Sequence, residues 1–524
     1  MSDPITVANT DFTNLTPFQK SMYTETETNS SSNSSQSSQD DDTKFFLRFY
    51  ANFIQKPWSD HMLIKFASLE EAGKMVFVPN MKFDFLLYEL LYTKLPALRV
   101  KDEHASQIQI CWTQNLSHSI VKKCEMYYDD GTSQTFDTVS LDNYRQFFLK
   151  KDMTKSYDRG IGNIPELIKW SHELPALTLK AHQPWYFSEE PYYAVPILLF
   201  NDRTDTKKTN TPIRFVYEFN LDVSKLLRMR RRVPDNLASK TIGVYRDKTG
   251  LWKDIPLRFE YLLGLPLNGK LQTPELLGRH VLVTPEEREW FKNKVAKDGL
   301  PIHITDMLAR DSGDTYKFGS QARIDIAYSS AVRAVLFVAE NMESTRNRSN
   351  SNYTTDINYY QGKKGLTFSP IETYELVYFN GVRVPRTPFD FANEVEPAYH
   401  FPNSRQRIEP GYGALSFGYG TGTVVSDTTV SFDKSKAEIV FNLGITNPYL
   451  QQSSGGVSQN ASKKKQTLDD GEEEEDIVSR DLFESDIISV PETKVDSSSR
   501  FTIHVRTVIV KKLTFGLGEC KIES

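Results

Sequence analysis

The chain has 524 residues, of which 39% are hydrophobic and 12% aromatic, and its net charge at pH 7 is −5. This length predicts two to four domains, and the composition is that of a globular chain whose cores contain many large flat side chains. The negative charge argues against a nucleic-acid coat, which needs an excess of Lys and Arg to displace counterions. We therefore expect no specific nucleic-acid partner.

The three cysteines and the N-terminus point to a cellular compartment. Cys111, Cys124 and Cys520 form no CxxC pair and cannot all be joined, which argues against a secreted disulfide scaffold. The first residues lack the basic and apolar regions of a signal peptide. The longest apolar run, from Phe83 to Leu98, is interrupted by charged residues and is too polar to span a membrane. The sequence predicts a soluble intracellular protein.

The N-terminal residues 1–43 are predicted to form an arm followed by a linker. Residues 4–23 carry scattered apolar side chains, whereas residues 24–43 are rich in Ser, Asn, Gln and Asp. Such polar, low-complexity composition cannot bury enough apolar surface to fold by itself.

Most of the remaining chain reads as short strands. The clearest covers residues 213–221, where Ile213, Phe215, Tyr217, Phe219 and Leu221 share one face, as in a half-buried antiparallel strand. Asn380-Gly381 predicts a hairpin turn. The other expected strands are residues 45–51, 62–66, 108–112, 120–128, 323–328, 332–340, 375–379, 413–419, 438–443 and 501–510.

Helices are expected to be few and short. Ser140 is a candidate cap for a helix over residues 141–151, and Thr284-Pro285-Glu286-Glu287 is a capping box that opens a helix over 285–295. Many short strands with few helices predict an all-β protein of sandwiches or jelly rolls, and not an α/β enzyme fold.

Polar segments suggest where the domains end. The Arg-rich residues 227–240 are a candidate hinge between a first domain, 44–226, and a second, 241–524. The cluster Arg228–Arg232 could also serve as a nuclear-import or phosphate patch. A disordered acidic insertion is expected at about 451–494 and a polar surface decoration at 342–364.

The sequence contains no constellation typical of catalysis. The nine histidines stand at no metal-ligand spacing, and neither a GxSxG elbow nor a P-loop occurs. The glycines of residues 411–422 precede a strand-like segment, which favours turns over a nucleotide loop. Glu189-Glu190 and Glu286-Glu287 could form an acid–base pair, but both lie where solvated acids are normal. We predict no enzyme activity, no cofactor, and no catalytic, cofactor-binding or metal-binding residues.

A series of short motifs, weak one by one, follows one order over most of the chain. They are residues 16–23 (TPFQKSMY), 95–96 (LP), 108–112 (IQICW), 116–120 (LSHSI), 161–163 (IGN), 185–188 (WYFS), 194–197 (AVPI), 281–283 (VLV), 286–291 (EEREWF), 335–338 (VLFV), 379–381 (FNG) and 413–417 (GALSF). In this order the chain resembles the major capsid protein of nucleocytoplasmic large DNA viruses, a group that includes the iridoviruses. It departs from that family at residues 424–432, where Q-P-S-G and N-x-S-R motifs are replaced by VVSDTTVSF.

The resemblance implies two tandem eight-stranded antiparallel jelly rolls with short inserted helices and long surface loops. It implies a structural virion protein that forms homotrimers, and these pseudo-hexagonal capsomers tile an icosahedral capsid assembled in the host cytoplasm. Its partners would be neighbouring capsomers, minor capsid proteins and, as an open alternative, an internal viral membrane reached by the N-terminal arm. A minor capsid or scaffold paralogue remains an alternative.

Two further alternatives come from other classes of protein. A carbohydrate-binding β-sandwich would use exposed aromatic side chains such as Trp185 or Trp252. A β-sandwich hydrolase would depend on a carboxylate.

Overall fold

The computed structural model describes residues 60–129, 131–189, 193–201, 212–238, 244–247, 249–326, 331–356, 369–378, 383–401, 408–417, 430–431, 437–444 and 499–523. The chain divides into two units, Met1–Gln55 and Lys56–Ser524. The described residues all belong to the second unit. The predicted N-terminal arm and linker, the strand at 45–51, the Asn380-Gly381 turn and the acidic insertion lie outside the described residues.

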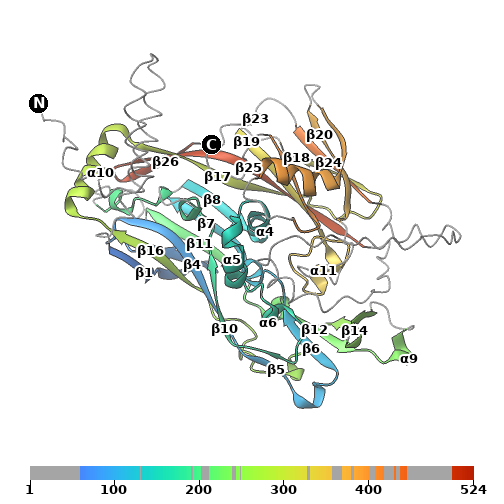
Figure 1. The fold of residues 1–524 in the computed structure, drawn as a ribbon. Helices are drawn as coiled ribbons and strands as arrows, with labels where there is room; N and C mark the ends of the chain where they lie inside the picture. The colour runs from blue at the N-terminus through green and yellow to red at the C-terminus, as the bar shows by residue number, and fades with distance from the viewer. Residues whose placement is uncertain are drawn as a thin grey trace, which may run out of the picture. The chain divides into compact units, whose positions relative to one another are not determined.

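The first part of this unit is a pair of antiparallel sheets (Figure 1). Apart from β2, this part has eight strands, which we number 1 to 8 in chain order for comparison. One sheet has the strand order 1-8-3-6 and the other 2-7-4-5, which is the arrangement of a jelly roll. We call it the first roll. One sheet contains β1 (Asp60–Lys65), β16 (Glu275–Leu282), β4 (Phe85–Leu95) and β10 (Leu177–His182); the other contains β2 (Ala67–Glu71), β3 (Lys74–Val78), β11 (Ile213–Phe219), β7 (Val121–Tyr128) and β8 (Gly131–Asp137).

The second roll repeats the same strand order. Its sheets are β17 (Leu300–Asp311), β25 (Phe501–Gly516), β19 (Ala331–Asn341) and β22 (Tyr412–Ser416), and β18 (Gln321–Asp325), β24 (Ala437–Leu443), β20 (Ile371–Tyr378) and β21 (Arg383–Pro388). The short strands β23 (Val430–Ser431) and β26 (Glu519–Glu523) pair with β19 and β25. Two rolls of eight strands confirm the predicted all-β fold class.

Segments inserted between the strands of the first roll build two small sheets and most of the helices. The small sheets are β13 (Val244–Asp247), β14 (Gly250–Ile255), β12 (Leu227–Arg232) and β6 (Ile108–Trp112), and β15 (Leu262–Leu263), β5 (Leu98–Val100) and β9 (Glu173–Leu174). The helices among the described residues are η2 (Asp102–His104), α3 (Leu116–Ile120), α4 (Thr138–Phe147), η3 (Lys151–Met153), α5 (Thr154–Ile161), α6 (Pro165–Ile168), α7 (Tyr186–Glu189), η5 (Ile197–Leu199), α8 (Val223–Leu226), α9 (Asp235–Ala238), η6 (Phe259–Tyr261), α10 (Pro285–Asp298), α11 (Met342–Arg346), η7 (Phe391–Val395) and α12 (Glu396–His400). None of these helices is long and apolar enough to cross a bilayer.

Aromatic side chains fill the core between the sheets of the first roll. Trp185, which precedes α7, is fully buried and packs against Phe215 and Tyr217 of β11 at ring-centroid distances of 5.6 and 6.5 Å. The alternation predicted for β11 is therefore confirmed, and its apolar face is the one that meets this core. At Gly278 of β16 an added Cβ would lie 2.2 Å from a ring carbon of Phe66, so the close packing there requires glycine.

The predicted hinge is wrong for its first part. Leu227–Arg232 is strand β12, paired with β6 and β14, and the side chains of Arg228 and Arg230 are buried. The sequence continues into β16, which lies between β1 and β4 of the first roll. The strand pairing thus carries the first roll to residue 282, beyond the expected boundary, because an insertion separates its last two strands.

Two other local predictions differ from the structure. Helix α4 begins at Thr138, and Asp137 caps it by accepting a hydrogen bond from the backbone nitrogen of Ser140 at 2.8 Å, so Ser140 is not the cap. In the polar segment expected at the surface, the described residues 342–356 include the buried Asn352 and Thr354. By contrast, the capping box of Thr284 and Glu287 is present and opens α10.

Candidate functional site

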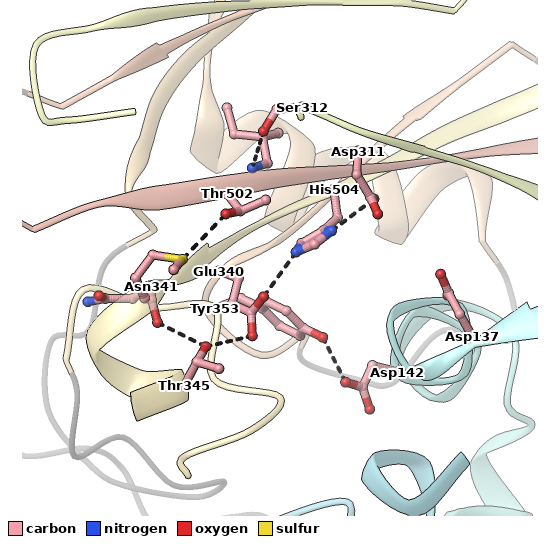
Figure 2. Close-up of polar contacts among 12 residues, drawn as sticks. Asp137, Asp142, Asp311, Ser312, Glu340, Asn341, Thr345, Tyr353, Thr502 and His504 are labelled. Atoms are coloured by element: carbon pink, nitrogen blue, oxygen red, sulfur yellow. Dashed lines mark hydrogen bonds and ion pairs between the residues drawn. The ribbon is translucent and has the colours of Figure 1, made fainter. Parts of the chain in front are cut away.

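The most elaborate cluster of polar side chains joins the two rolls to each other. It is formed by β8, α3 and α4 of the first roll and by β17, β19, β25 and the segment after α11 of the second (Figure 2). Strand β8 lies directly beside β17. We call the contacts described below the inter-roll joint.

Arg506 of β25 is the central cation of the inter-roll joint. Its side chain is 1% exposed, and its Nη2 and Nε donate to the two carboxylate oxygens of Asp137 at 2.6 and 3.2 Å. Its Nη1 donates to Asp311 of β17 at 2.8 Å. Burial opposes the charge of Arg506, but Asp137 and Asp311 outweigh it and raise its pKa. A bidentate pair of this kind fixes both distance and orientation between the rolls.

His504 lies two residues earlier on the same face of β25 and bridges two acids. Its Nδ1 is 2.8 Å from Asp311 Oδ1 and its Nε2 is 3.1 Å from Glu340 Oε2. Burial disfavours protonation, but hydrogen bonds to Asp311 and Glu340, and their charges, raise the pKa of His504 to about 9. Thr345 of α11 donates to the other oxygen of Glu340 at 2.8 Å (Figure 2).

A second ion pair lies where β8 runs beside β17. Asp306 is 1% exposed, accepts from Lys511 Nζ at 2.6 Å and accepts from the backbone nitrogen of Thr135 at 3.0 Å. Gln134 donates to the carbonyl oxygen of Thr305 at 2.7 Å and accepts from the backbone nitrogen of Tyr186 at 2.8 Å. Two backbone groups of β8, the nitrogen of Thr135 and the carbonyl oxygen of Ser133, thus bond to the second roll, which covers part of an edge that could otherwise pair with another chain.

The segment after α11 inserts into the first roll. Tyr353 donates to Asp142 of α4 at 2.8 Å, and the other oxygen of that carboxylate is 2.7 Å from His118 Nδ1 and accepts from Asn115 at 2.8 Å. These four side chains are buried. The contact ties the second roll to helices α3 and α4.

Backbone contacts extend this insertion. The backbone nitrogen of Asn350 donates to Thr113 Oγ1 at 3.1 Å. The side chain of Gln114 donates to the carbonyl oxygen of Ser351 at 2.9 Å. The side chain of Arg348 donates to the carbonyl oxygen of Ser224 at 2.8 Å. The prediction of a surface decoration is therefore wrong for the described part of this segment, because several of its polar groups bond to the other roll and others bond within the segment.

The remaining contacts of the inter-roll joint lie at the end of α4. Arg145, whose side chain is fully buried, donates to Asp158 of α5 at 2.7 Å and to Glu409 of the second roll at 3.0 Å. Breaking a buried pair leaves an uncompensated charge, which costs far more than the pair contributes at a surface.

The acid–base candidates Glu286 and Glu287 belong to helix α10 and not to this joint. Glu286 and Glu287 stand in the first turn of α10, where Glu287 completes the capping box. Glu190 and the glycines of 418–422 lie outside the described residues. Within the described ranges, no group of three or more His, Cys, Asp or Glu side chains is arranged to hold a metal ion.

The aromatic and basic candidates are structural. Trp185 and Trp252 are 0% and 2% exposed, so neither can offer a flat surface to a sugar. Arg230 lies over the rings of Trp170 and Trp252, at 4.7 and 4.3 Å from their centroids, and pairs with Asp247 at 2.6 Å. This part of the Arg-rich cluster is a packed cation–π stack and not an open phosphate patch.

No family model matches the chain. The major capsid protein of Invertebrate iridescent virus 6 is 24% identical over 361 residues, which are 64% of this chain and 67% of that protein. That of Frog virus 3 (isolate Goorha) is 23% identical over 345 residues, 60% of this chain and 65% of that protein. The chain thus spans about two thirds of the length of the curated relatives that it matches.

Solved structures show the same fold. The Faustovirus major capsid protein covers 88% of this chain and 92% of its own with a TM-score of 0.58, at 9% identity. The chain is a double jelly-roll relative of viral major capsid proteins. A chain of the PBCV-1 virus capsid likewise has a TM-score of 0.55 at 10% identity, covering 88% of this chain and 96% of its own.

These relatives confirm the resemblance read from the ordered motifs. The curated relatives are major capsid proteins, structural rather than enzymatic, in agreement with the prediction that the chain is not an enzyme. Sequence reasoning missed the inter-roll joint. The available signal was the polar face of β25, where Thr502, His504 and Arg506 alternate with apolar residues.

Proposed function

We propose that this chain is a capsid protein that builds a viral shell as a homotrimer of double jelly rolls. The observation that carries the proposal is the presence of two complete rolls of identical strand order in a relative of viral major capsid proteins. Three such chains supply six rolls, enough for a pseudo-hexagonal capsomer that can tile an icosahedral shell.

The inter-roll joint supports this proposal on physical grounds. A capsomer made of two rolls per chain keeps a fixed outline only if the rolls do not swing against each other. Arg506, whose side chain is 1% exposed, ties β25 to Asp137 at the end of β8. The Asp306–Lys511 pair of the second roll adds hydrogen bonds to the β8 backbone at Thr135 and Ser133. Interfaces between domains in one chain are otherwise often small and mobile.

The proposed partners are other copies of the chain, neighbouring capsomers and minor capsid proteins, and the proposed location is the virion, with assembly in the host cytoplasm. A stable trimer interface buries well over about 2,000 Å². We also propose an internal viral membrane as a partner reached by the N-terminal arm of residues 1–43, and a disordered acidic insertion at about 451–494.

Negative-stain electron microscopy of the purified full chain tests the proposal. We expect uniform particles with a hexagonal outline. Compact particles without threefold symmetry would contradict it and would favour a minor capsid or scaffold paralogue, whose partner is a different chain.

A further inference from the structure

The geometry around His504 requires a charged ring. Its two nitrogens face Asp311 and Glu340 at 2.8 and 3.1 Å, and ionised carboxylates only accept hydrogen bonds. Both ring nitrogens must therefore carry hydrogen, which makes the ring an imidazolium. The side chain is 12% exposed, so water offers it little replacement for either partner.

Every element packed against His504 contributes a charged or titratable group. Strand β17 supplies Asp311, β19 supplies Glu340, and β25 itself supplies Arg506. The first roll supplies Asp137 through Arg506. The segment after α11 places Tyr353 near Glu340, and the hydroxyl of Tyr353 donates to Asp142 (Figure 2).

Asp311 is shared between two cations, and this sharing couples the histidine to the other roll. Its Oδ1 accepts from both His504 and Arg506 at 2.8 Å. When His504 loses its proton, one ring nitrogen presents a lone pair to a carboxylate, which is repulsive. Arg506, which contacts Asp311 and Asp137 through different nitrogens, then remains the nearest cation for Asp311.

We propose that His504 is a proton-controlled latch: its protonated ring keeps Arg506 on Asp137, and loss of that proton in alkaline solution loosens the joint between the two jelly rolls. The latch acts within one chain and goes beyond the proposed shell function. It can therefore be tested on the isolated protein whatever its oligomeric state.

The direction of each pKa shift determines whether the latch opens in acid or in alkali. His504 has a raised folded pKa of about 9, so its contribution is complete below its unfolded pKa of about 6.5 and is lost as pH rises through 9. Asp311 and Glu340 have folded pKa values below their ordinary range despite burial, which opposes their ionisation, because His504 hydrogen-bonds to both. Their contributions are lost only in acid, below about pH 4. The latch is closed at neutral and mildly acidic pH, unlike histidine switches that open on acidification.

The experiment compares the full-length wild type with His504→Gln and with the control His303→Gln, an exposed histidine on β17 of the same sheet. Urea unfolding is measured at half-unit steps from pH 6 to 10. Hydrogen exchange of residues 133–137, corrected for the intrinsic pH dependence, reports on the joint itself. Between pH 7 and 10 we expect the unfolding equilibrium constants of wild type and His303→Gln to rise roughly 100-fold more than that of His504→Gln, since each pKa unit is tenfold.

If the free energy of unfolding falls with pH equally steeply in wild type and in His504→Gln, the latch proposal is overturned. Unchanged corrected protection of residues 133–137 in wild type above pH 9 would overturn it as well. If His504→Gln does not fold, the wild type alone decides: histidine-selective ¹³C labelling must show one ring that titrates near pH 9, and titration of every ring below pH 7.5 would contradict the proposal.

Discussion

Arg506 and Asp137 lie 369 residues apart in the chain, yet Arg506 donates two hydrogen bonds to Asp137 at 2.6 and 3.2 Å. Asp137 also caps helix α4 through the backbone nitrogen of Ser140. The same carboxylate thus lies at the end of β8, caps helix α4 and accepts hydrogen bonds from Arg506 of the second roll. The two rolls are therefore joined where β8 meets the start of α4.

Replacing Arg506 by Met should destabilise the protein strongly. The substitution keeps an unbranched apolar stem but removes the guanidinium, which leaves Asp137 and Asp311 without this cation, and removing one partner of a buried pair costs about 3–5 kcal/mol. Because both acids are partly exposed, we expect about 2–3 kcal/mol, measured by urea unfolding.

The matched control for this change is Arg323→Met on β18. Arg323 is exposed and 3.9 Å from Glu438, so its loss should cost no more than about 1 kcal/mol. Equal effects of the two substitutions would mean that the inter-roll joint adds nothing to stability.

Asp84→Asn should loosen helix α10 from the first roll. The buried carboxylate of Asp84 accepts from Arg288 at 2.7 and 3.0 Å and from the backbone nitrogen of Val283 at 2.9 Å. The amide keeps the size but loses the charge, and we expect a loss of about 2–4 kcal/mol. Glu289→Gln, on the exposed face of the same helix, should be near neutral, and a comparable loss there would point to a general effect of charge.

Gly278→Ala tests whether β16 packs inside the first roll. The new methyl group would lie 2.2 Å from Phe66 and 2.7 Å from Leu86, so both side chains must move. Overpacking of this kind costs about 1–3 kcal/mol. At Gly444 an added Cβ has its nearest neighbour at 3.7 Å, and Gly444→Ala should be tolerated. If both variants melt alike in calorimetry, the close packing of β16 is wrong.

Glu89→Gln should stabilise the protein at alkaline pH. Glu89 is fully buried, and burial raises its pKa well above the ordinary value although Trp185 donates to it at 2.8 Å. A raised folded pKa means that the wild type loses stability above the unfolded pKa of about 4.3, by about 1.4 kcal/mol per pH unit, until the folded pKa is reached. Glutamine cannot ionise, so this loss disappears. Urea unfolding midpoints at pH 5 and pH 8 measure this loss of stability. If stability changes equally between these two pH values in wild type and in Glu89→Gln, the prediction is refuted.

The regular strands were predictable because their patterns are local. The alternation from Ile213 to Phe219 identifies β11, and the capping box at Thr284 identifies the start of α10. Strand β4 was missed because it is apolar on both faces and contains Glu89, whose partner Trp185 is 96 residues away. No local pattern shows that a buried acid will find an indole.

The boundary between the rolls and the inter-roll joint depend on long-range pairing. Asn350 and Ser351 read as solvent-exposed residues, but they meet Thr113 and Gln114, which are 237 residues away. The arginines of β12 read as a linker because sequence does not show Trp170 and Trp252 lying against Arg230. In both places, polar side chains lie inside the protein because partners distant in the sequence satisfy them, and a hydrophobic pattern does not reveal this.

The solution mass of the purified full chain tests the central claim most directly. One chain has a mass of 60.1 kDa, and light scattering coupled to size exclusion at micromolar concentration should give a single species of about three times that mass. A monomer under the same conditions would contradict the account of this chain as the building block of a trimeric capsomer.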